Sequence, residues 1–209
     1  MITSTDRRDI DSRRELLVTL AHRAYAMGLV PGISGNLSVR VPGQPWIVIK
    51  VTGKSLGDMT PADTLLLDLE GNVLEDGTSL RPSKERFFHA AIYRRRPDVG
   101  AVVHLHPPHA VAFAAVHALP PILTGAARAF LEGKMALIPP APSGSRELAE
   151  MVGAAFQDPA IMAAILAEHG TITVGPDLYA AFYLTQYLED TARTACLVRL
   201  LREGREPRA

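Results

Sequence analysis

Two histidines separated by one residue give the first indication of chemistry in this sequence. His104 and His106 lie in the segment 102–108, which reads VVHLHPP. The apolar, β-branched run predicts a buried strand, and the two prolines predict its end. Side chains at positions i and i+2 of a strand leave from the same face, so both imidazole rings can reach one metal ion. A structural role for the pair is the alternative, and the pair alone does not decide between them.

A carboxylate with a second candidate role lies at the start of a predicted helix. Glu85 ends the segment Pro82-Ser83-Lys84-Glu85, which precedes an apolar helical pattern that stops at Pro97. An acidic side chain in the first turn of a helix is favoured by the helix dipole, which is the structural interpretation. The functional interpretation is a general acid or base directed into the same pocket as the two histidines.

Two glycine-containing segments are candidates for binding an anion. Gly35-Asn36 belongs to a turn rich in glycine and small polar residues, and Thr52-Gly53 follows a predicted strand. Glycine permits the positive φ angles that direct backbone N–H groups toward an anion. An ordinary turn explains each segment equally well. A nucleotide-binding P-loop is rejected because Val48 stands where that motif requires glycine.

Composition restricts the class of protein. The chain has 209 residues and 47% hydrophobic residues, which is enough for one sizeable core, so we expect a single domain over residues 1–209. Its 22 basic and 22 acidic residues balance, which argues against binding to nucleic acid or to an anionic membrane. Cys196 is the only cysteine, and the N-terminal segment is too charged for a signal peptide. We therefore expect a soluble, cytoplasmic protein.

Hydrophobic periodicity predicts alternating helices and strands. A capping box at Ser12 predicts the start of the first helix, so residues 1–10 and 203–209 are expected to be mobile tails. The remaining pattern predicts further helices and short strands. The predicted strands are 37–41, 46–51, 64–69, 102–106, 135–138 and 171–174, and the predicted helices are 12–27, 82–96, 109–117, 146–156, 158–168 and 176–202.

Read together, the motifs resemble the class II aldolase/adducin family over about residues 12 to 200. They are Gly35-Asn36, Thr52-Gly53, Ser83-Lys84-Glu85, His104-x-His106 and His169-Gly170, in this order along the chain. The resemblance implies a three-layer α/β/α domain with a central, mainly antiparallel sheet. It also implies a homotetramer with active sites at subunit interfaces.

The resemblance assigns roles to individual residues. Three histidines match metal ligands, which usually hold Zn²⁺, with Mn²⁺, Co²⁺ or Fe²⁺ as alternatives, and Glu85 matches the catalytic residue. The ligands are His104, His106 and His169, and the matched substrate or phosphate contacts are Gly35, Asn36, Thr52, Gly53 and Ser83. Lys84 stands where aldolases have a second serine, which favours the decarboxylase branch and could pair with a substrate carboxylate or phosphate. The alternative to this pairing is that Lys84 is simply solvated at the start of the helix. His109 is not among the expected metal ligands, and we expect it on the pocket rim or in a helix.

The implied function is a metal-dependent carbon–carbon lyase, either a decarboxylase or an aldolase. Its substrate would be a small phosphorylated sugar or sugar acid, cleaved through a metal-stabilised enolate or enediolate. Three alternatives remain at this point. They are an epimerase or dehydratase of a sugar phosphate, a lyase for a non-phosphorylated carboxylic acid, and a non-catalytic, adducin-like interaction module.

Overall fold

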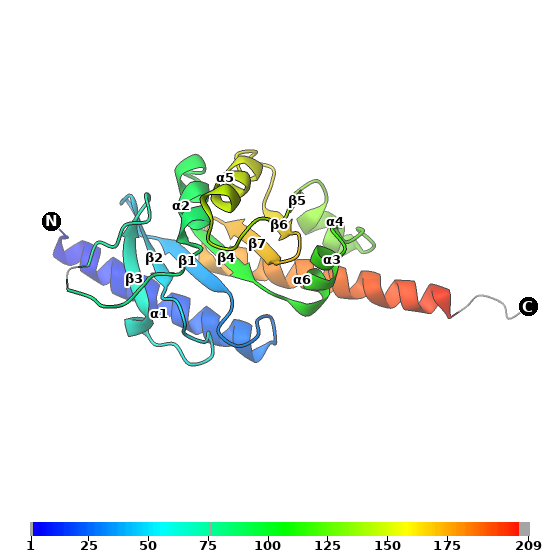
Figure 1. Cartoon of the computed structure of the whole chain (residues 1–209), viewed down its shortest axis with the longest axis horizontal. Helices are drawn as coiled ribbons and strands as arrows, with labels where there is room; N and C mark the ends of the chain where they lie inside the picture. The colour runs from blue at the N-terminus through cyan, green and yellow to red at the C-terminus, as the bar shows by residue number, and fades with distance from the viewer. Residues whose placement is uncertain (1, 76, 205–209) are drawn as a thin grey trace, which may run out of the picture.

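A single seven-stranded sheet organises the computed structural model, which describes residues 2–75 and 77–204 (Figure 1). The strands lie in the order β3-β2-β1-β4-β7-β6-β5. Every neighbouring pair is antiparallel except β5 and β6, as predicted for a mainly antiparallel sheet. The strands are β1 (Asn36–Arg40), β2 (Trp46–Lys50), β3 (Thr64–Asp68), β4 (Ala101–Leu105), β5 (Met135–Ile138), β6 (Ala163–Leu166) and β7 (Gly170–Gly175).

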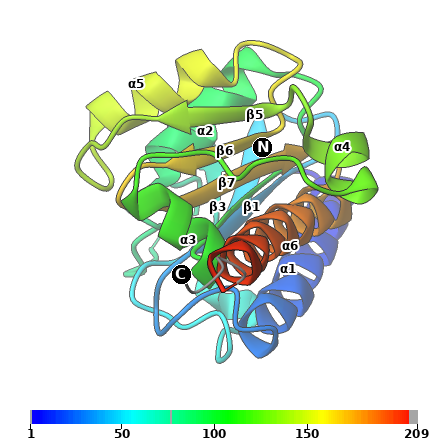
Figure 2. The ribbon, with the colours of Figure 1, turned by 90° about the vertical axis from the view of Figure 1, so that its right-hand side faces the viewer.

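Helices cover both faces of this sheet, which confirms the expected three-layer α/β/α architecture (Figure 2). Helices α2 and α5 lie on one face, and α1 and α6 lie on the other. The helices are α1 (Ser4–Ala26), α2 (Arg86–Arg95), α3 (Pro108–Ala115), α4 (Gly125–Leu131), α5 (Arg146–Ala155) and α6 (Leu178–Glu203), with a short 3₁₀ turn at Pro61–Asp63.

Strand β4 lies at the centre of the sheet between β1 and β7, and all five of its residues are buried. Because side chains alternate along a strand, Val103 packs into the core beneath α1 and α6, whereas Val102 packs beneath α2 and α5. His104 leaves on the same face as Val102, and its ring contacts that of Phe88 in α2 edge to face. The strand therefore delivers His104 to the α2 side of the sheet.

The structure corrects the prediction of an N-terminal tail. Helix α1 begins at Ser4, with Thr3 and Asp6 forming the capping box instead of Ser12. In this longer helix Ile10 is buried in the core. At the other end α6 continues to Glu203, and residues 205–209 lie outside the described part of the chain.

Two other elements differ from the sequence prediction. The segment predicted as a helix over 158–168 contains strand β6, and the segment between Pro120 and Gly133, expected to be a connector, contains α4. The residues of β6 are two alanines, an isoleucine and a leucine, which suit a helix by propensity but are fully buried between β5 and β7. Tertiary pairing therefore overrides the local preference.

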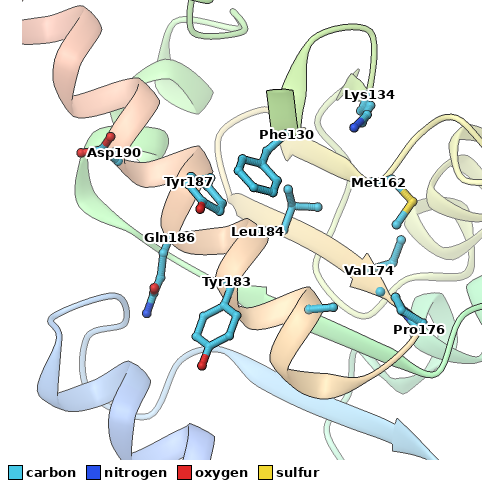
Figure 3. A pocket seen from close by; sticks show the side chains of 12 residues that line it. Phe130, Lys134, Met162, Val174, Pro176, Tyr183, Leu184, Gln186, Tyr187 and Asp190 are labelled. Atoms are coloured by element: carbon cyan, nitrogen blue, oxygen red, sulfur yellow. The ribbon is translucent and has the colours of Figure 1, made fainter. Parts of the chain in front are cut away.

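An apolar groove of about 620 Å³ lies on α6 away from the histidines (Figure 3). Phe130 of α4 stacks on Tyr187 of α6, and Met162, Tyr183 and Leu184 continue the lining. No helix among the described residues has an 18-residue stretch apolar enough to cross a membrane. The cytoplasmic location expected from composition stays a prediction.

Candidate active site

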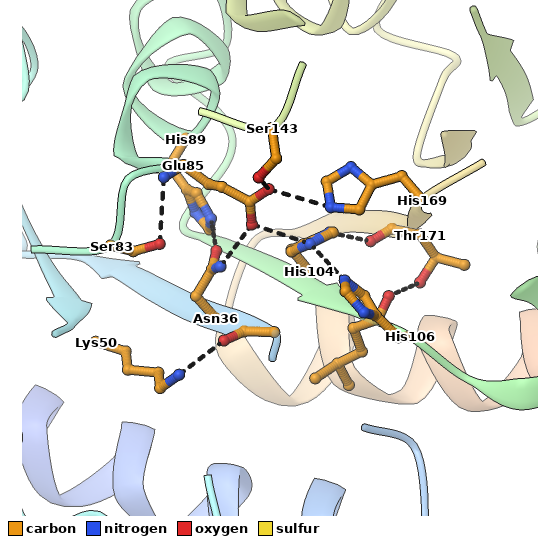
Figure 4. Close-up of polar contacts among 12 residues, drawn as sticks. Asn36, Lys50, Ser83, Glu85, His89, His104, His106, Ser143, His169 and Thr171 are labelled. Carbon is orange, nitrogen blue, oxygen red and sulfur yellow. Dashed lines mark hydrogen bonds and ion pairs between the residues drawn. The ribbon is translucent and has the colours of Figure 1, made fainter. Parts of the chain in front are cut away.

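The three predicted histidines lie together at one end of the central strands (Figure 4). His104 is the fourth residue of β4, His106 follows the end of that strand, and His169 immediately precedes β7. One ring nitrogen from each histidine lies within 4.8 Å of the others. The antiparallel pairing of β4 with β7 produces this proximity, because it places the end of β4 beside the start of β7.

Close backbone packing holds the histidines in place. Gly170 follows His169, and a Cβ atom at this position would lie 2.6 Å from Cδ2 of His106 and 2.8 Å from the carbonyl oxygen of Leu105. The absence of a side chain at Gly170 therefore lets the two imidazole-bearing segments approach each other. The backbone N–H of His106 also donates to the carbonyl of Leu29 at 3.1 Å.

The carboxylate of Glu85 lies at the centre of the histidine cluster. Its Oε2 atom lies 3.1 Å from Nε2 of His104, and its Oε1 atom lies 3.2 Å from Nε2 of His169. Asn36 donates from Nδ2 to Oε2 at 2.8 Å, and Ser143 donates from its hydroxyl to Oε1 at 2.7 Å. Glu85 is the N-cap residue of α2 and makes no side-chain capping bond, so its carboxylate serves the site and not the helix end.

The surroundings of Glu85 favour its ionised form. Burial by itself raises the pKa of this carboxyl, because only 8% of the side chain is exposed. Charge interaction with His104 and hydrogen bonds from His104, His169 and Asn36 outweigh burial and hold the pKa far below its usual range. Glu85 is therefore a carboxylate at neutral pH.

The donor set fits a divalent cation. Nδ1 of His104 donates to the carbonyl of Thr171 at 2.9 Å, so Nε2 carries either the proton that it donates to Glu85 or, when the ring is neutral, a lone pair. That lone pair faces Nε2 of His106 at 3.0 Å and the Glu85 carboxylate at 3.1 Å. Acceptor atoms this close repel one another unless a proton or a cation lies among them. Three imidazoles with an adjacent carboxylate are also the ligand types that zinc and similar metals take in catalytic sites.

Imidazole protonation does not compete strongly with a metal at His106. Burial is the largest cause that lowers the pKa of this histidine to about 3, and the nearby His104 and His169 act in the same direction. His106 is therefore neutral at physiological pH, the form in which imidazole binds metal ions.

A glycine turn forms the neighbouring wall of the site. Gly35 has a φ angle of 68°, and a Cβ atom there would lie 2.8 Å from Cγ2 of Val30 and 3.0 Å from the carbonyl oxygen of His104. Gly53 also has a positive φ angle, of 76°, and no described atom lies within 4 Å of where its Cβ would be. The first glycine thus permits close packing on β4, whereas the second leaves open space beside the backbone.

A buried lysine forms hydrogen bonds to the backbone of the glycine turn. Lys50, the last residue of β2, is 2% exposed and donates from Nζ to the carbonyls of Ile33 at 2.9 Å and Gly35 at 3.1 Å. Burial lowers its pKa to about 8, and the negative charge of Glu85 partly opposes that change. The lysine therefore places a positive charge beside the turn below about pH 8.

The predicted site residues surround one cavity of about 220 Å³. All of them line it except His104, which is completely buried behind it. Lys84 is exposed at the rim, and Ser83 is buried and accepts a hydrogen bond from the N–H of Glu85 at 3.3 Å. The lining includes Gly35, Asn36, Thr52, Gly53, Ser83, Lys84, Glu85, His106 and His169.

His109 lies apart from this cavity, in agreement with its exclusion from the metal ligands. It is in the first turn of α3, where its Nδ1 atom lies 2.6 Å from the carboxylate of Glu189 in α6. The same carboxylate accepts from the backbone N–H groups of His109 and Ala110. Glu189 therefore caps α3 from a neighbouring helix.

Sequence reasoning missed three residues at this site: Lys50, Ser143 and His89. Lys50 ends a β-branched strand, and a charged residue within such a run was the available signal. Ser143 lies in a proline-rich loop with no periodic pattern, so the sequence offered no signal for it. His89 follows Glu85 by four residues, a spacing that places both on one side of a helix.

Comparison with known proteins supports the resemblance found in the sequence. The family model for the Class II Aldolase and Adducin N-terminal domain matches residues 15–196. The chain is 35% identical to a 3-oxo-tetronate 4-phosphate decarboxylase of Haemophilus influenzae, with 87% of this chain and 86% of the relative covered. It is 33% identical to an L-fuculose phosphate aldolase of Methanococcus maripaludis, with 89% and 97% covered.

Solved structures agree with these relatives. The L-fuculose-1-phosphate aldolase of Thermus thermophilus superposes with a TM-score of 0.77 at 28% identity, covering 95% of this chain and 100% of that chain. An aldolase II superfamily protein of Pseudomonas syringae gives a TM-score of 0.82 at 23% identity, covering 95% and 81%, which supports the fold. The relatives are lyases, which confirms the prediction of an enzyme. The chain therefore belongs to the class II aldolase and adducin family.

Proposed function

We propose that this protein is a metal-dependent carbon–carbon lyase, a decarboxylase or an aldolase, acting on a small phosphorylated sugar or sugar acid. One observation carries the proposal. The ionised Glu85 and the three-histidine cluster share a cavity with a glycine turn supported by a buried lysine. A proton acceptor, a cation site and an anion site thus lie within the reach of one small molecule.

His104, His106 and His169 would hold the metal ion, and zinc is the ion we propose. When bound, a divalent cation supplies positive charge beside the substrate oxygen on which negative charge develops as a carbon–carbon bond next to a carbonyl breaks.

Glu85 would move the proton. In aldol cleavage its carboxylate accepts the proton of the substrate hydroxyl on the carbon that leaves as aldehyde, and returns that proton to the carbanionic carbon of the other product. In decarboxylation no such hydroxyl proton is released, so the proton delivered to carbon comes from water. Ser143 and Asn36 each donate a hydrogen bond to one carboxylate oxygen of Glu85. These two bonds fix the orientation of the carboxylate.

The glycine turn and Lys50 would bind the anionic end of the substrate. Backbone N–H groups near Gly35 and Gly53 and the Lys50 ammonium provide donors for a phosphate group. The names of both relatives include a phosphate-bearing substrate, which supports this assignment. Lys84 at the rim is suited to a second anionic group, which favours a sugar-acid substrate and decarboxylation over aldol cleavage.

We also propose that the protein assembles as a homotetramer with active sites at subunit interfaces. The support for assembly is the apolar groove on α6, together with the exposure of large aromatic side chains at its edge. The placement of active sites at the interfaces rests on the family resemblance. Phe130 and Tyr183 are 43% and 40% exposed, and both line the same apolar groove, the kind of contiguous patch that marks a protein–protein interface.

The first prediction concerns metal binding. His106→Gln should weaken zinc affinity by at least the roughly 10- to 100-fold typical of changes near metal ligands, because it removes one nitrogen of the cluster. Isothermal titration with Zn²⁺ and elemental analysis of the purified protein measure this. His117→Gln is the matched control, since His117 is an exposed histidine paired with Glu168. Equal zinc affinity in the His106 variant and the wild type would contradict the assignment.

The second prediction concerns the reaction. Zinc-loaded protein should release CO₂ from a phosphorylated 3-oxo acid or an aldehyde from a ketose phosphate in a screen that records both. Glu85→Gln should retain zinc and lower kcat by about 100- to 10,000-fold, because the amide cannot accept the proton. Isomeric products without cleavage would show an epimerase, loss of water a dehydratase, and turnover only of unphosphorylated acids a different substrate class. An inert protein without metal would indicate an interaction module.

The third prediction concerns Lys50 and inorganic phosphate. Phosphate affinity of the wild type should fall by about tenfold per pH unit above about pH 8, as the Lys50 ammonium loses its proton. Lys50→Met should bind more weakly at pH 7 and lose this slope, whereas Lys54→Met, at an exposed lysine beside Gly53, should keep it. Phosphate titrations monitored by thermal shift provide the measurement. An unchanged slope in Lys50→Met would disprove the role.

The fourth prediction concerns assembly. Sedimentation velocity should give the mass of four chains, and Tyr183→Asp should lower it because a buried carboxylate destabilises an apolar interface. Tyr25→Asp is a suitable control, since this tyrosine is 45% exposed on α1, outside the groove. A monomeric wild type at micromolar concentration would refute the proposal.

A further inference from the structure

A chain of buried hydrogen bonds extends from Glu85 away from the cavity, and Figure 4 shows its first members, Asn36 and His89. Asn36 donates to Glu85, and its Oδ1 atom lies 2.5 Å from Nε2 of His89. Nδ1 of His89 lies 2.7 Å from the hydroxyl of Ser38, which lies 2.9 Å from the hydroxyl of Tyr93. His89 and Ser38 are completely buried, and neither lines the cavity.

The position of the Asn36 amide gives the direction of each bond in this chain. Its Nδ2 atom, a donor, lies 2.8 Å from Oε2 of Glu85, which leaves the acceptor Oδ1 for His89. Its carbonyl oxygen then faces His89, and Nε2 of His89 must carry the proton. Nδ1 is consequently the acceptor, and the Ser38 hydroxyl donates a hydrogen bond to it.

His89 is held as a neutral imidazole. Burial lowers its pKa to about 3, and the neighbouring His104 acts in the same direction against the smaller effect of Glu85. A neutral ring in one tautomer has one donor and one acceptor, which are the two roles that this chain requires.

We propose that His89 is a positioning residue that fixes the amide orientation of Asn36 and, through it, the carboxylate of Glu85. The inference rests on the proposed function, since it assigns the purpose of this orientation to proton transfer by Glu85. Without the His89 donor, the buried Oδ1 atom of Asn36 loses this hydrogen-bond partner, and the Asn36 side chain can turn toward another donor. The NH₂ group that holds Oε2 of Glu85 then moves away, and the carboxylate loses its orientation.

The alternative is that His89 only satisfies buried polar atoms and stabilises the fold. Tyr93 separates the two interpretations because it lies in the same network, is equally buried and is two bonds further from Asn36. Loss of the Tyr93 hydroxyl leaves the bonds from Ser38 to His89, Asn36 and Glu85 in place. A structural role predicts similar effects at both positions, and a positioning role predicts an effect on turnover only at His89.

The kinetic test uses full-length, zinc-loaded protein. His89→Phe should lower kcat by about 10- to 100-fold with KM changed by less than about twofold, while zinc content is retained. His89→Gln should recover most of this loss, because its amide can donate to Asn36. Tyr93→Phe should keep wild-type kcat although it loses thermal stability. Equal losses of kcat in His89→Phe and Tyr93→Phe, or no recovery with glutamine, would overturn the proposal.

A second measurement does not depend on activity. Long-range ¹H–¹⁵N correlation spectra of the wild type identify the tautomer of each imidazole, and comparison with His89→Gln assigns the His89 signals. The expected form is neutral with the proton on Nε2. A proton on Nδ1 would reverse the Asn36 amide and refute the inference, whatever the activity. A wild type without lyase activity in the substrate screen would refute the proposed function instead, and the spectra would still decide the orientation of Asn36.

Discussion

The negative charge of Glu85 is the constraint on which the arrangement of the site depends. A carboxylate that is 8% exposed is very unfavourable unless hydrogen bonds or opposite charge compensate for its lost hydration. Its four partners come from separate parts of the chain. Asn36 begins β1, His104 lies in β4, His169 precedes β7 and Ser143 lies in the loop before α5. The order β1-β4-β7 at the centre of the sheet is what brings these segments to one carboxylate.

Local patterns in the sequence were sufficient for parts of the fold and the site. The β-branched run that ends in two prolines correctly predicted β4 and the common direction of the His104 and His106 side chains. Met135–Ile138 was predicted with its observed bounds. These features depend on residues close together in the sequence, where alternation and turn chemistry determine the conformation.

Features that depend on distant pairing were not accessible from local patterns. The proximity of His169 to His104 follows from the pairing of β4 with β7, and only the family resemblance suggested it. As a local motif the box Ser12-x-x-Glu15 is the better one, because Thr3 is followed three residues later by Asp6 and not by Glu or Gln. The helix nevertheless begins after Thr3, and Ile10 is buried in the core. Lys50 reads as the polar end of a strand, yet its ammonium is buried because the turn at Gly35 folds over it.

The polar network behind Glu85 shows how a periodic pattern can be correct while its interpretation is not. Glu85, His89 and Tyr93 recur every four residues, and Asn36, Ser38 and Arg40 recur every two. Such spacings ordinarily predict polar faces directed to solvent.

Here the polar face of α2 and the polar face of β1 pack against each other. The Arg40 guanidinium, for example, lies 4.9 Å from the centre of the Tyr93 ring. An apolar interface would pack equally well and would avoid the cost of burying polar groups, so packing alone does not account for the polar residues. Directional hydrogen bonds do account for them, because they specify one orientation of the Asn36 amide where apolar contacts would allow two. The bonds from His89 to Asn36 and from Asn36 to Glu85 are therefore best understood as supporting the active site, although His89 itself does not line the cavity.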